Sequence, residues 1–384
     1  MAIDIDLSDL NRQQPEKARV RVGYIPLADC APVLLAAELG FDCKYGIEIE
    51  PVQQASWAQL RDGLVTGQLD AAHALYGLIY GSHLGIGCPA TPMAVLMGLN
   101  RNGQAITLAN RLAEQGVCDG PSLKALLRSG ARPTLAHTAT TGTHAMWLCY
   151  WLAAQGIHPL QDLDLIALPP QRMVAALQAG QIQGFCAGEP WNALAIAGNA
   201  GFTVTTSQAI WPDHPEKVLG VCASWLAGHR HTARALMAAV LDSCRWLDEQ
   251  SDPDHVIDML AAPEVIGLPR QIIADRFMGR YQDGLGRQWH DAHPLCFFDH
   301  GQVNFPWLSD GLWFIDQFRR WGLIRGAIDP LTEVSRLQQT ALYRSAAALS
   351  GVSVPAAGMR TSTLVDGRVW AGHHWSEPEP AVTS

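Results

Sequence analysis

The chain has 384 residues, of which 48% are hydrophobic and 16% charged, and its 27 Lys and Arg against 36 Asp and Glu give a net charge of −9. This composition excludes an intrinsically disordered chain, and no heptad repeat indicates a coiled coil. An acidic chain without a Lys/Arg-rich run also argues against nucleic-acid binding, so no direct nucleic-acid partner is expected.

The N-terminal residues and the cysteines bear on the compartment. Asp4, Asp6 and Asp9 interrupt any apolar run, so the sequence predicts no secretory signal. No stretch reaches 18 apolar residues, which predicts no membrane span. The nine cysteines are scattered and form no CxxC pair, a pattern typical of reduced core thiols. We therefore expect a cytoplasmic protein without a membrane partner.

The first third of the chain alternates between strand and helix patterns. Residues 19–25 alternate as a strand does, and residues 32–40 have helix composition, with a proline in the first turn and a glycine at the end. A second strand is expected over 47–52, a helix over 56–67 with Ser56 as N-cap, and a short element over 69–75. This β-α-β-α-β rhythm predicts a parallel sheet covered by helices.

The same rhythm returns after residue 113. Strands are expected over 132–137, 164–167 and 183–186, and helices over 144–155, 171–179 and 191–198. Residues 218–225 read as a strand that returns to the first unit, followed by a helix over 231–250 and further helices such as 313–321. We therefore predict an N-terminal arm (1–18), a discontinuous lobe I (19–112 and 217–349), a lobe II (113–216) and a loosely ordered tail (350–384).

Two α/β units of this kind predict a two-lobed protein with a ligand cleft between the lobes. Ligands bind to such sheets beyond the carboxyl ends of the strands. The loops expected there are rich in polar residues, glycine and tryptophan; they are residues 26–32, 55–57, 100–104, 138–144, 188–192 and 211–217.

Signatures of common catalytic and metal sites are missing from the sequence. There is no GxxxxGK[ST], GxSxG, HExxH or CxxC motif. His290 and His293, and likewise His229 and His231, lack a Cys, Asp or Glu partner at a recognisable spacing, so surface or capping roles are expected. We therefore expect no catalytic residues, no metal and no cofactor.

Several of the cleft loops carry groups suited to a small oxyanion. Trp57 is either a packed core residue or a flat wall with one N–H donor. Gly103 and Gln104 lie in an amide-rich stretch that is either an ordinary turn or a close backbone approach to a ligand. His144 follows a Thr-rich loop at a predicted helix N-terminus, where an anion can bind, and Lys217 is either a surface charge or a cleft ammonium.

The sequence resembles a known family over residues 19–330. The resemblance rests on the runs GYIPLADCAPVLLAAELGF, EIEPVQQASWAQLRDGL, NGQAITLAN, GTHAMWLCYWLAAQGI, LPPQRMVAALQAGQIQGFCAGEPWNALA and DHPEKVLGV. These runs are similar to the nitrate-binding proteins of nitrate ABC transporters and to their bicarbonate-binding relative. The resemblance implies an α/β, two-lobed, type II periplasmic-binding-protein-like fold.

The resemblance also implies the ligand-binding residues. It places the anion-binding groups on Trp57, Gly103, Gln104, His144 and Lys217 and thereby implies nitrate or nitrite as the ligand. It leaves open what Glu189 and Asn192 do.

Three functions follow from the resemblance. Because no export signal is expected, the chain looks most like the cytoplasmic nitrate/nitrite sensors of the NasS type. Such a sensor would hold an ANTAR-domain antiterminator of the NasT type and release it on ligand binding. The alternatives are a substrate-binding receptor of a nitrate ABC transporter and an enzyme of the thiamine-pyrimidine-synthesis type on the same fold.

Overall fold

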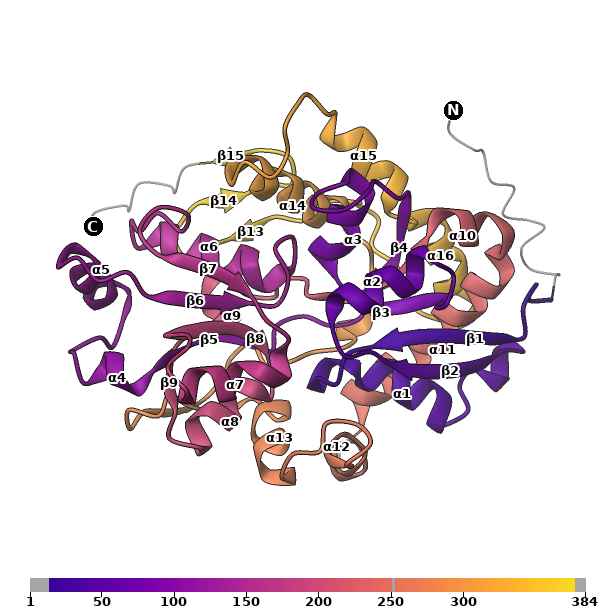
Figure 1. Cartoon of the computed structure of the whole chain (residues 1–384). Helices are drawn as coiled ribbons and strands as arrows, with labels where there is room; N and C mark the ends of the chain where they lie inside the picture. The colour runs from indigo at the N-terminus through magenta and orange to yellow at the C-terminus, as the bar shows by residue number, and fades with distance from the viewer. Residues whose placement is uncertain (1–13, 251–252, 377–384) are drawn as a thin grey trace, which may run out of the picture.

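The computed structural model describes residues 14–250 and 253–376 and confirms the predicted two-lobed α/β architecture. Each lobe is built on a five-stranded mixed sheet with helices on its faces, and the two lobes lie beside each other (Figure 1). The N-terminal arm predicted over 1–18 falls mostly outside the described residues.

The first lobe contains the sheet with strand order β2-β1-β3-β10-β4. Strand β1 runs parallel to β2 and β3, whereas β10 runs antiparallel to both of its neighbours. The strands are β1 (Arg19–Tyr24), β2 (Glu48–Gln53), β3 (Ala71–Leu75), β4 (Met93–Gly98) and β10 (Lys217–Cys222).

The second lobe repeats this plan with strand order β7-β6-β8-β5-β9. Strand β6 runs parallel to β7 and β8, and β5 runs antiparallel to β8 and β9. The strands are β5 (Gln104–Ala109), β6 (Thr134–His137), β7 (Asp164–Ala167), β8 (Gly184–Gly188) and β9 (Gly201–Thr206). Residues 104–109, which the sequence analysis assigned to lobe I, therefore pair within the second sheet.

The chain crosses between the lobes after β4 and again before β10. These crossing segments, residues 99–103 and 207–216, lie side by side, because Arg101 forms an antiparallel bridge with Pro215. The backbone N–H of Asn102 also donates to the carbonyl of His214 at 3.3 Å. Strand β5 of the second sheet directly follows the first crossing segment, and strand β10 of the first sheet directly follows the second one, so the crossing segments lie between the two sheets.

Helices cover both sheets. Those that pack on the first lobe or follow it are α1 (Ala31–Glu38), α2 (Trp57–Val65), α3 (Tyr76–Leu84), α10 (Ala223–Gly228), α11 (Arg230–Glu249), α12 (Asp254–Ala261), α13 (Arg270–Phe277), α14 (Leu308–Arg320), α15 (Pro330–Leu337) and α16 (Thr340–Leu349). Those of the second lobe are α4 (Asn110–Ala113), α5 (Gly120–Arg128), α6 (Thr143–Ala154), α7 (Pro170–Gln178), α8 (Trp191–Ala197) and α9 (Ser207–Ile210).

The C-terminal stretch packs against both the first lobe's helices and the second lobe. Part of the tail that the sequence analysis expected to be loosely ordered forms a small antiparallel sheet of β13 (Ser362–Thr363), β14 (Val369–Trp370) and β15 (Trp375–Ser376). The hydroxyl of Tyr150 in α6 donates to Asp366 at 2.9 Å, and the indole of Trp370 donates to the carbonyl of Ser309 in α14 at 2.9 Å. A hairpin of β11 (Arg280–Gln282) and β12 (Gln288–His290) also reaches the second lobe, where Thr203 donates its backbone N–H to Asp283.

One buried apolar cluster extends through both lobes. It includes Trp57 and Leu75 from the first lobe and Trp147 and Phe185 from the second, together with Trp313 of α14. A second cluster lies between the first sheet, α1, α11 and α16. Because the first cluster is continuous across the cleft, the lobes are closed on each other.

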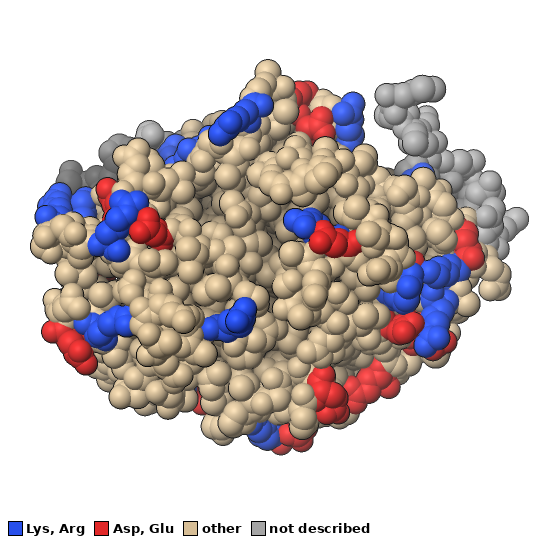
Figure 2. Space-filling view, in the orientation of Figure 1, with Lys and Arg blue, Asp and Glu red and all other residues tan. Residues whose placement is uncertain are grey.

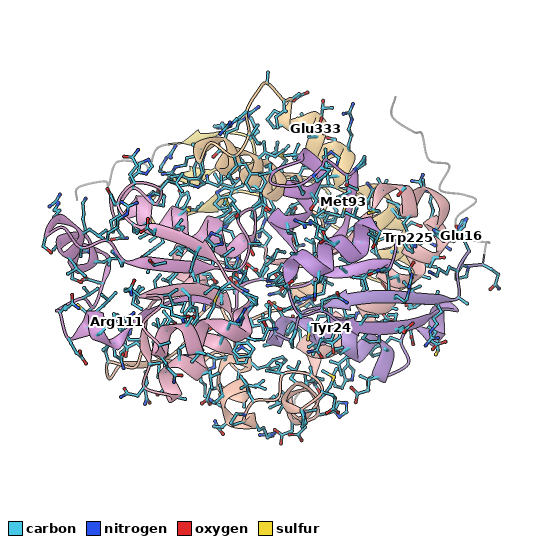
Figure 3. All side chains as sticks on the ribbon, viewed as in Figure 1. Glu16, Tyr24, Met93, Arg111, Trp225 and Glu333 are labelled. Atoms are coloured by element: carbon cyan, nitrogen blue, oxygen red, sulfur yellow. The ribbon has the colours of Figure 1, made fainter. Side chains whose placement is uncertain are left out.

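Charged groups of both signs lie on the face of the molecule that Figure 2 shows. Lys/Arg and Asp/Glu side chains are interspersed over the face in Figure 2. Glu16 and Arg111 lie at opposite ends of the molecule in Figure 3, the first near the outer end of lobe I and the second in lobe II. Among the described residues, no helix is long and apolar enough to span a membrane.

Candidate functional site

A buried ion cluster lies where β10 begins, next to the second crossing segment. The ammonium of Lys217, the first residue of β10, lies 2.7 Å from Asp29 Oδ2 and 2.8 Å from Glu216 Oε1. Asp29 sits in the short 3-10 helix η2 (Ala28–Cys30) and also contacts the ring of His73 at 2.9 Å. The side chains of all four residues are at most 2% exposed, so Lys217 is not a surface lysine.

The ion pairs decide the charge states in this cluster. Burial alone would raise the pKa of Asp29, but the charge of Lys217 and the hydrogen bond from His73 outweigh burial and hold that pKa well below its usual value. The pKa of Glu216 is likewise lowered, because Lys217 outweighs burial. Burial would lower the pKa of Lys217, but the two carboxylates raise it. Both carboxylates and the ammonium are therefore charged at neutral pH.

Glu216 connects this cluster to the second lobe. Its carboxylate accepts hydrogen bonds from Thr143 Oγ1 at 2.5 Å and from Trp147 Nε1 at 2.9 Å, both in the first turns of α6. The Nε2 atom of His144 lies 3.5 Å from Glu216 Oε1. The sequence analysis left this helix N-terminus open to an exogenous anion, but part of its donor capacity is used by the protein's own carboxylate.

Three of the predicted site residues keep a buried hydrogen-bonding atom without a partner. These atoms are Trp57 Nε1, Gln104 Nε2 and His144 Nε2. Unsatisfied buried donors are costly in a folded protein, since each loses its hydrogen bonds to water. Donors left open at the junction of two lobes indicate a place for a hydrogen-bond acceptor.

Local structure holds each of these donors. Trp57 is the first residue of α2, which is capped by Ser56 as predicted, and the ring centroid lies 5.7 Å from Lys217 Nζ. Gln104 opens β5 opposite Gly188. His144 contacts the hydroxyl of Thr138 through Nδ1 at 2.6 Å, and its Nε2, 3.5 Å from Glu216 Oε1, makes no hydrogen bond within the protein. Burial lowers the pKa of His144 to about 3, so the imidazole is neutral.

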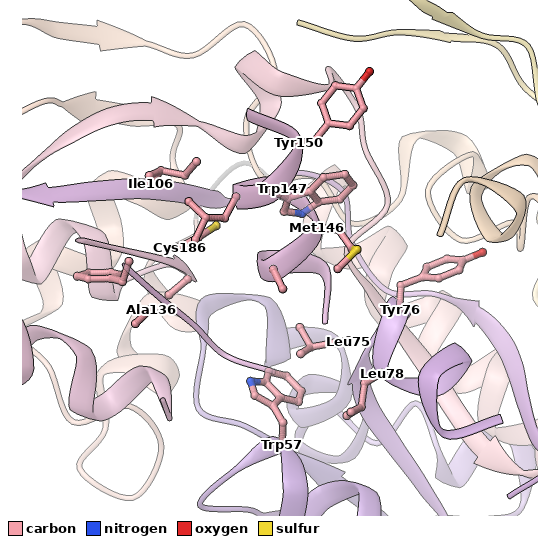
Figure 4. Close-up of a cluster of buried hydrophobic side chains, with 14 of the residues drawn as sticks. Trp57, Leu75, Tyr76, Leu78, Ile106, Ala136, Met146, Trp147, Tyr150 and Cys186 are labelled. Atoms are coloured by element: carbon pink, nitrogen blue, oxygen red, sulfur yellow. The ribbon is translucent and has the colours of Figure 1, made fainter. Parts of the chain in front are cut away.

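The close-up view shows buried apolar side chains on the two sides of the junction. Trp57 and Leu75 belong to the first lobe, and Met146 and Trp147 lie opposite them on α6 (Figure 4).

Gly103 has φ of +90°, and a Cβ there would meet a methyl group of Leu295 at 2.9 Å. The structure therefore explains Gly103 by its backbone conformation and its packing.

Glu189 and Asn192, whose roles the sequence left open, hold the protein together at β8 and α8. Glu189 accepts from the backbone N–H of Ala193 at 3.1 Å and lies 3.3 Å from the guanidinium of Arg276. Asn192 donates to the carbonyl of Ala187 and accepts from Thr107. Both side chains are thereby engaged within the protein.

Sequence reasoning missed several residues of the site. Asp29 and Glu216 were not singled out, although both lie in loops that were expected at the cleft, and His73 carried no signal in its strand pattern.

No group of three or more His, Cys, Asp and Glu side chains could hold a metal ion within the described part of the chain. His293 contacts Asp213 at 3.1 Å, and His229 contacts the carbonyl of Trp225.

Comparison with known proteins agrees with this architecture. Residues 13–261 match the NMT1-like family. The nitrate/nitrite binding protein NrtA of Synechocystis sp. is 35% identical over 352 residues, which cover 89% of this chain and 78% of that protein. The crystal structure of the periplasmic nitrate-binding protein NrtA from Synechocystis matches with a TM-score of 0.89 and 32% identity over 94% of this chain and 97% of that one.

A longer relative matches as well. The nitrate import ATP-binding protein NrtC of Synechocystis sp. is 36% identical over 86% of this chain, and the chain spans about half, 50%, of that protein's length.

The fold of this chain and the buried junction between its lobes define a two-lobed protein of the periplasmic-binding-protein type. The chain belongs to the nitrate/bicarbonate ABC-transporter substrate-binding family, within the NMT1-like proteins.

Proposed function

We propose that this chain binds nitrate or nitrite between its lobes and serves as the substrate-binding receptor of a nitrate ABC transporter. The observation that carries the proposal is the set of three buried, unpartnered atoms, Trp57 Nε1, Gln104 Nε2 and His144 Nε2. The similarity to nitrate/nitrite binding protein NrtA along most of both chains supports the same ligand.

The chemistry of nitrate fits these groups. Nitrate is planar, carries one negative charge and has oxygens that only accept hydrogen bonds. Trp57 would give it a flat wall and one N–H donor, and Gln104 and His144 would give further donors. Lys217 has three N–H donors and uses two of them on Asp29 and Glu216, so one remains for the ligand. Gly103, whose φ is +90°, would fix the backbone conformation next to Gln104.

Calorimetry of the purified protein with nitrate, nitrite and bicarbonate tests the ligand. We expect saturable binding of nitrate or nitrite, and a Gln104→Leu variant should bind at least tenfold more weakly, because it loses the amide donor at nearly constant volume. Gln317→Leu is the matched control, since Gln317 is a buried glutamine of α14 outside the site. Equal affinity in wild type and Gln104→Leu would contradict the site.

A second role on the same site is that of a cytoplasmic sensor. In this role the ligand-free chain would hold an ANTAR-domain antiterminator of the NasT type and release it when nitrate or nitrite binds. The observation in favour is that all nine cysteines are free thiols, two of them on exposed residues, Cys43 and Cys118, which suits a reducing compartment. The chain would act by binding alone and catalyse no reaction.

Two experiments separate the receptor from the sensor. A receptor should stimulate ATP hydrolysis by the reconstituted nitrate transporter when nitrate is present. A sensor should co-elute with the antiterminator from a sizing column and lose it when nitrate is added. A chain that binds nitrate but leaves the ATPase rate unchanged would contradict the receptor role, and an unchanged complex at saturating nitrate would contradict the sensor role.

A further inference from the structure

A hydrogen-bond chain lies behind Gln104, on the side away from its unpartnered nitrogen. The side-chain oxygen Oε1 of Gln104 lies 3.1 Å from Ser207 Oγ, and the backbone N–H of Gln104 donates to the same hydroxyl at 3.2 Å. Ser207 Oγ in turn lies 2.8 Å from His214 Nε2. All three side chains are buried, so water does not compete for these bonds.

Few hydrogens are available to the hydrogen bonds that link Gln104, Ser207 and His214. The other ring nitrogen of His214, Nδ1, lies 3.1 Å from the carbonyl of Pro215, which can only accept, so Nδ1 carries a hydrogen. Ser207 has one hydroxyl hydrogen, which it can give to His214 Nε2, to Gln104 Oε1 or to the main-chain carbonyl of Gln104, which also lies 3.1 Å away. The side-chain carbonyl of Gln208, at 3.3 Å, is a longer alternative, and its amide is held by Asp291.

Two arrangements satisfy these atoms. When His214 is neutral, Nε2 accepts the hydroxyl hydrogen of Ser207, and the serine oxygen, which accepts from the backbone N–H of Gln104, has room for a second donor. The amide of Gln104 can then turn its nitrogen toward Ser207 and its oxygen away from Ser207. When His214 carries a second hydrogen, its Nε2 and the backbone N–H of Gln104 both donate to Ser207 Oγ. The serine oxygen then cannot accept from the amide nitrogen as well, so Gln104 Oε1 faces Ser207. The amide nitrogen then faces the cleft as an open donor, as Gln104 Nε2 does in the structure.

The charges around His214 favour protonation of its imidazole ring when an anion binds. Asp29 and Glu216 carry two negative charges against the one positive charge of Lys217, so an added monoanion would leave the cluster with two uncompensated negative charges. Of the charged groups facing His214, Glu216 stabilises an imidazolium, whereas Arg360 and Lys217 oppose it. Arg360 is itself neutralised by a two-pronged ion pair with Asp310, with both contacts at 2.9 Å. Burial lowers the pKa of His214 to about 4.

We propose that nitrate binding takes up one proton on His214, and that Ser207 transmits this proton state to Gln104 so that the amide N–H₂ faces the ligand. This proposal rests on the nitrate-binding function proposed above and adds its regulation by pH. An oxyanion that itself carries an O–H, such as bicarbonate, can donate to the amide oxygen of the other arrangement and needs no proton on His214. Ser207 and His214 are therefore positioning residues that set the preference between the two kinds of anion.

Calorimetric titration of wild-type protein with nitrate at pH 6.5, in buffers of different ionisation enthalpy, measures the proton directly. We expect the observed enthalpy to vary with the buffer with a slope close to one proton taken up. Nitrate affinity should fall as pH rises above 4, by up to tenfold per pH unit, until the pKa of His214 in the complex is passed. Ser207→Ala and His214→Gln should remove the proton uptake and lower the ratio of nitrate to bicarbonate affinity, measured at pH 8, at least fivefold.

Ser243→Ala is the matched control, because Ser243 is a buried serine of α11 outside the chain of hydrogen bonds and its Oγ has no partner. It should keep both the proton uptake and the anion preference. Wild-type protein that binds nitrate without proton uptake would overturn the proposal and leave the nitrate-binding function standing. Proton uptake that persists in His214→Gln would also overturn it, whereas a failure of wild type to bind nitrate at all would contradict the proposed function itself.

Discussion

The ammonium of Lys217 lies 2.7 Å from the carboxylate of Asp29, although 188 residues separate them in the sequence. Both side chains are buried. Lys217 therefore neutralises two carboxylates. One belongs to Asp29, in its own lobe, and the other to Glu216, the residue just before its strand. Any role of Lys217 in anion binding is added to this role in the folded protein.

Replacing Lys217 with alanine should destabilise the ligand-free protein. The substitution leaves Asp29 and Glu216 buried close together without a counter-charge, and breaking a buried pair in this way costs about 3–5 kcal/mol. Urea unfolding of the ligand-free protein, followed by circular dichroism, measures the loss. Lys44→Ala is the control, since its ion pair with Asp242 is formed by a lysine side chain that is 58% exposed. A loss below 1 kcal/mol for Lys217→Ala would show that the pair is not needed for stability.

Acid should weaken the fold through its buried histidines. Burial lowers the pKa of both His137 and His214 to about 4, while an unfolded histidine takes up its proton near pH 6.5. Between those values the unfolded chain binds more protons, so the free energy of unfolding falls as pH falls, by at most about 1.4 kcal/mol per pH unit for each histidine. Urea unfolding at pH 7, 6 and 5 measures the slope. His137→Gln should reduce the slope, and an unchanged slope would exclude His137 as a contributor.

Trp57→Phe should weaken nitrate binding while keeping the apolar wall. The variant keeps a six-membered aromatic ring but loses the five-membered ring of the indole with its N–H, whose nitrogen is buried without a partner, so we expect a loss of at least about 1 kcal/mol, or roughly fivefold in affinity. Calorimetry with nitrate measures the change. Trp225→Phe is the control, because Trp225 in α10 also has a buried Nε1 without a partner but lies outside the site. If both variants bind nitrate as tightly as wild type does, the Trp57 indole N–H does not contact the ligand.

Gly77→Ala should hold the lobes apart. A Cβ at Gly77 in α3 would lie 2.0 Å from the backbone oxygen of Thr141 in the second lobe, a contact that only a shift of the lobes can relieve. We expect a larger radius of gyration in small-angle X-ray scattering with saturating nitrate, and at least tenfold weaker nitrate binding. Gly228→Ala is the control, since a Cβ there meets nothing within 4 Å. Scattering identical to wild type would mean that the α3 contact does not control closure.

The strand and helix pattern of the sequence predicted the frame of each lobe but not all of its strands. The alternation in β1 and the Ser56 cap of α2 were sufficient because they are local signals. Strands β4 and β5 are buried at almost every position, so they lack the alternation that marks a strand with one exposed face. The predicted strand 218–225 ends at Cys222 and continues as α10, because the apolar run serves two elements in succession.

The candidate site was only partly accessible to the sequence. Trp57, Gln104, His144 and Lys217 were selected. The structure brings Trp57, His144 and Lys217 around Glu216 at one junction between the lobes, and places Gln104 at the start of β5, opposite Gly188. The partners that determine their chemistry could not be read from spacing, because Asp29 meets Lys217 only through the pairing of β3 with β10 and the return of the chain to the first lobe. Glu216 stands next to Lys217 in sequence, yet its contacts with α6 depend on how the lobes close.

The burial of the site between closed lobes has a kinetic consequence. Trp57, Gln104 and His144 are each at most 2% exposed, so an anion held by them has no path to solvent while the lobes stay together. Escape then requires a conformational step first, and the dissociation rate equals the rate of that step multiplied by the chance that the ion leaves before reclosure. In stopped-flow measurements, a chase with excess of a second anion should leave this rate unchanged, because the competitor cannot reach the occupied site to displace its contents.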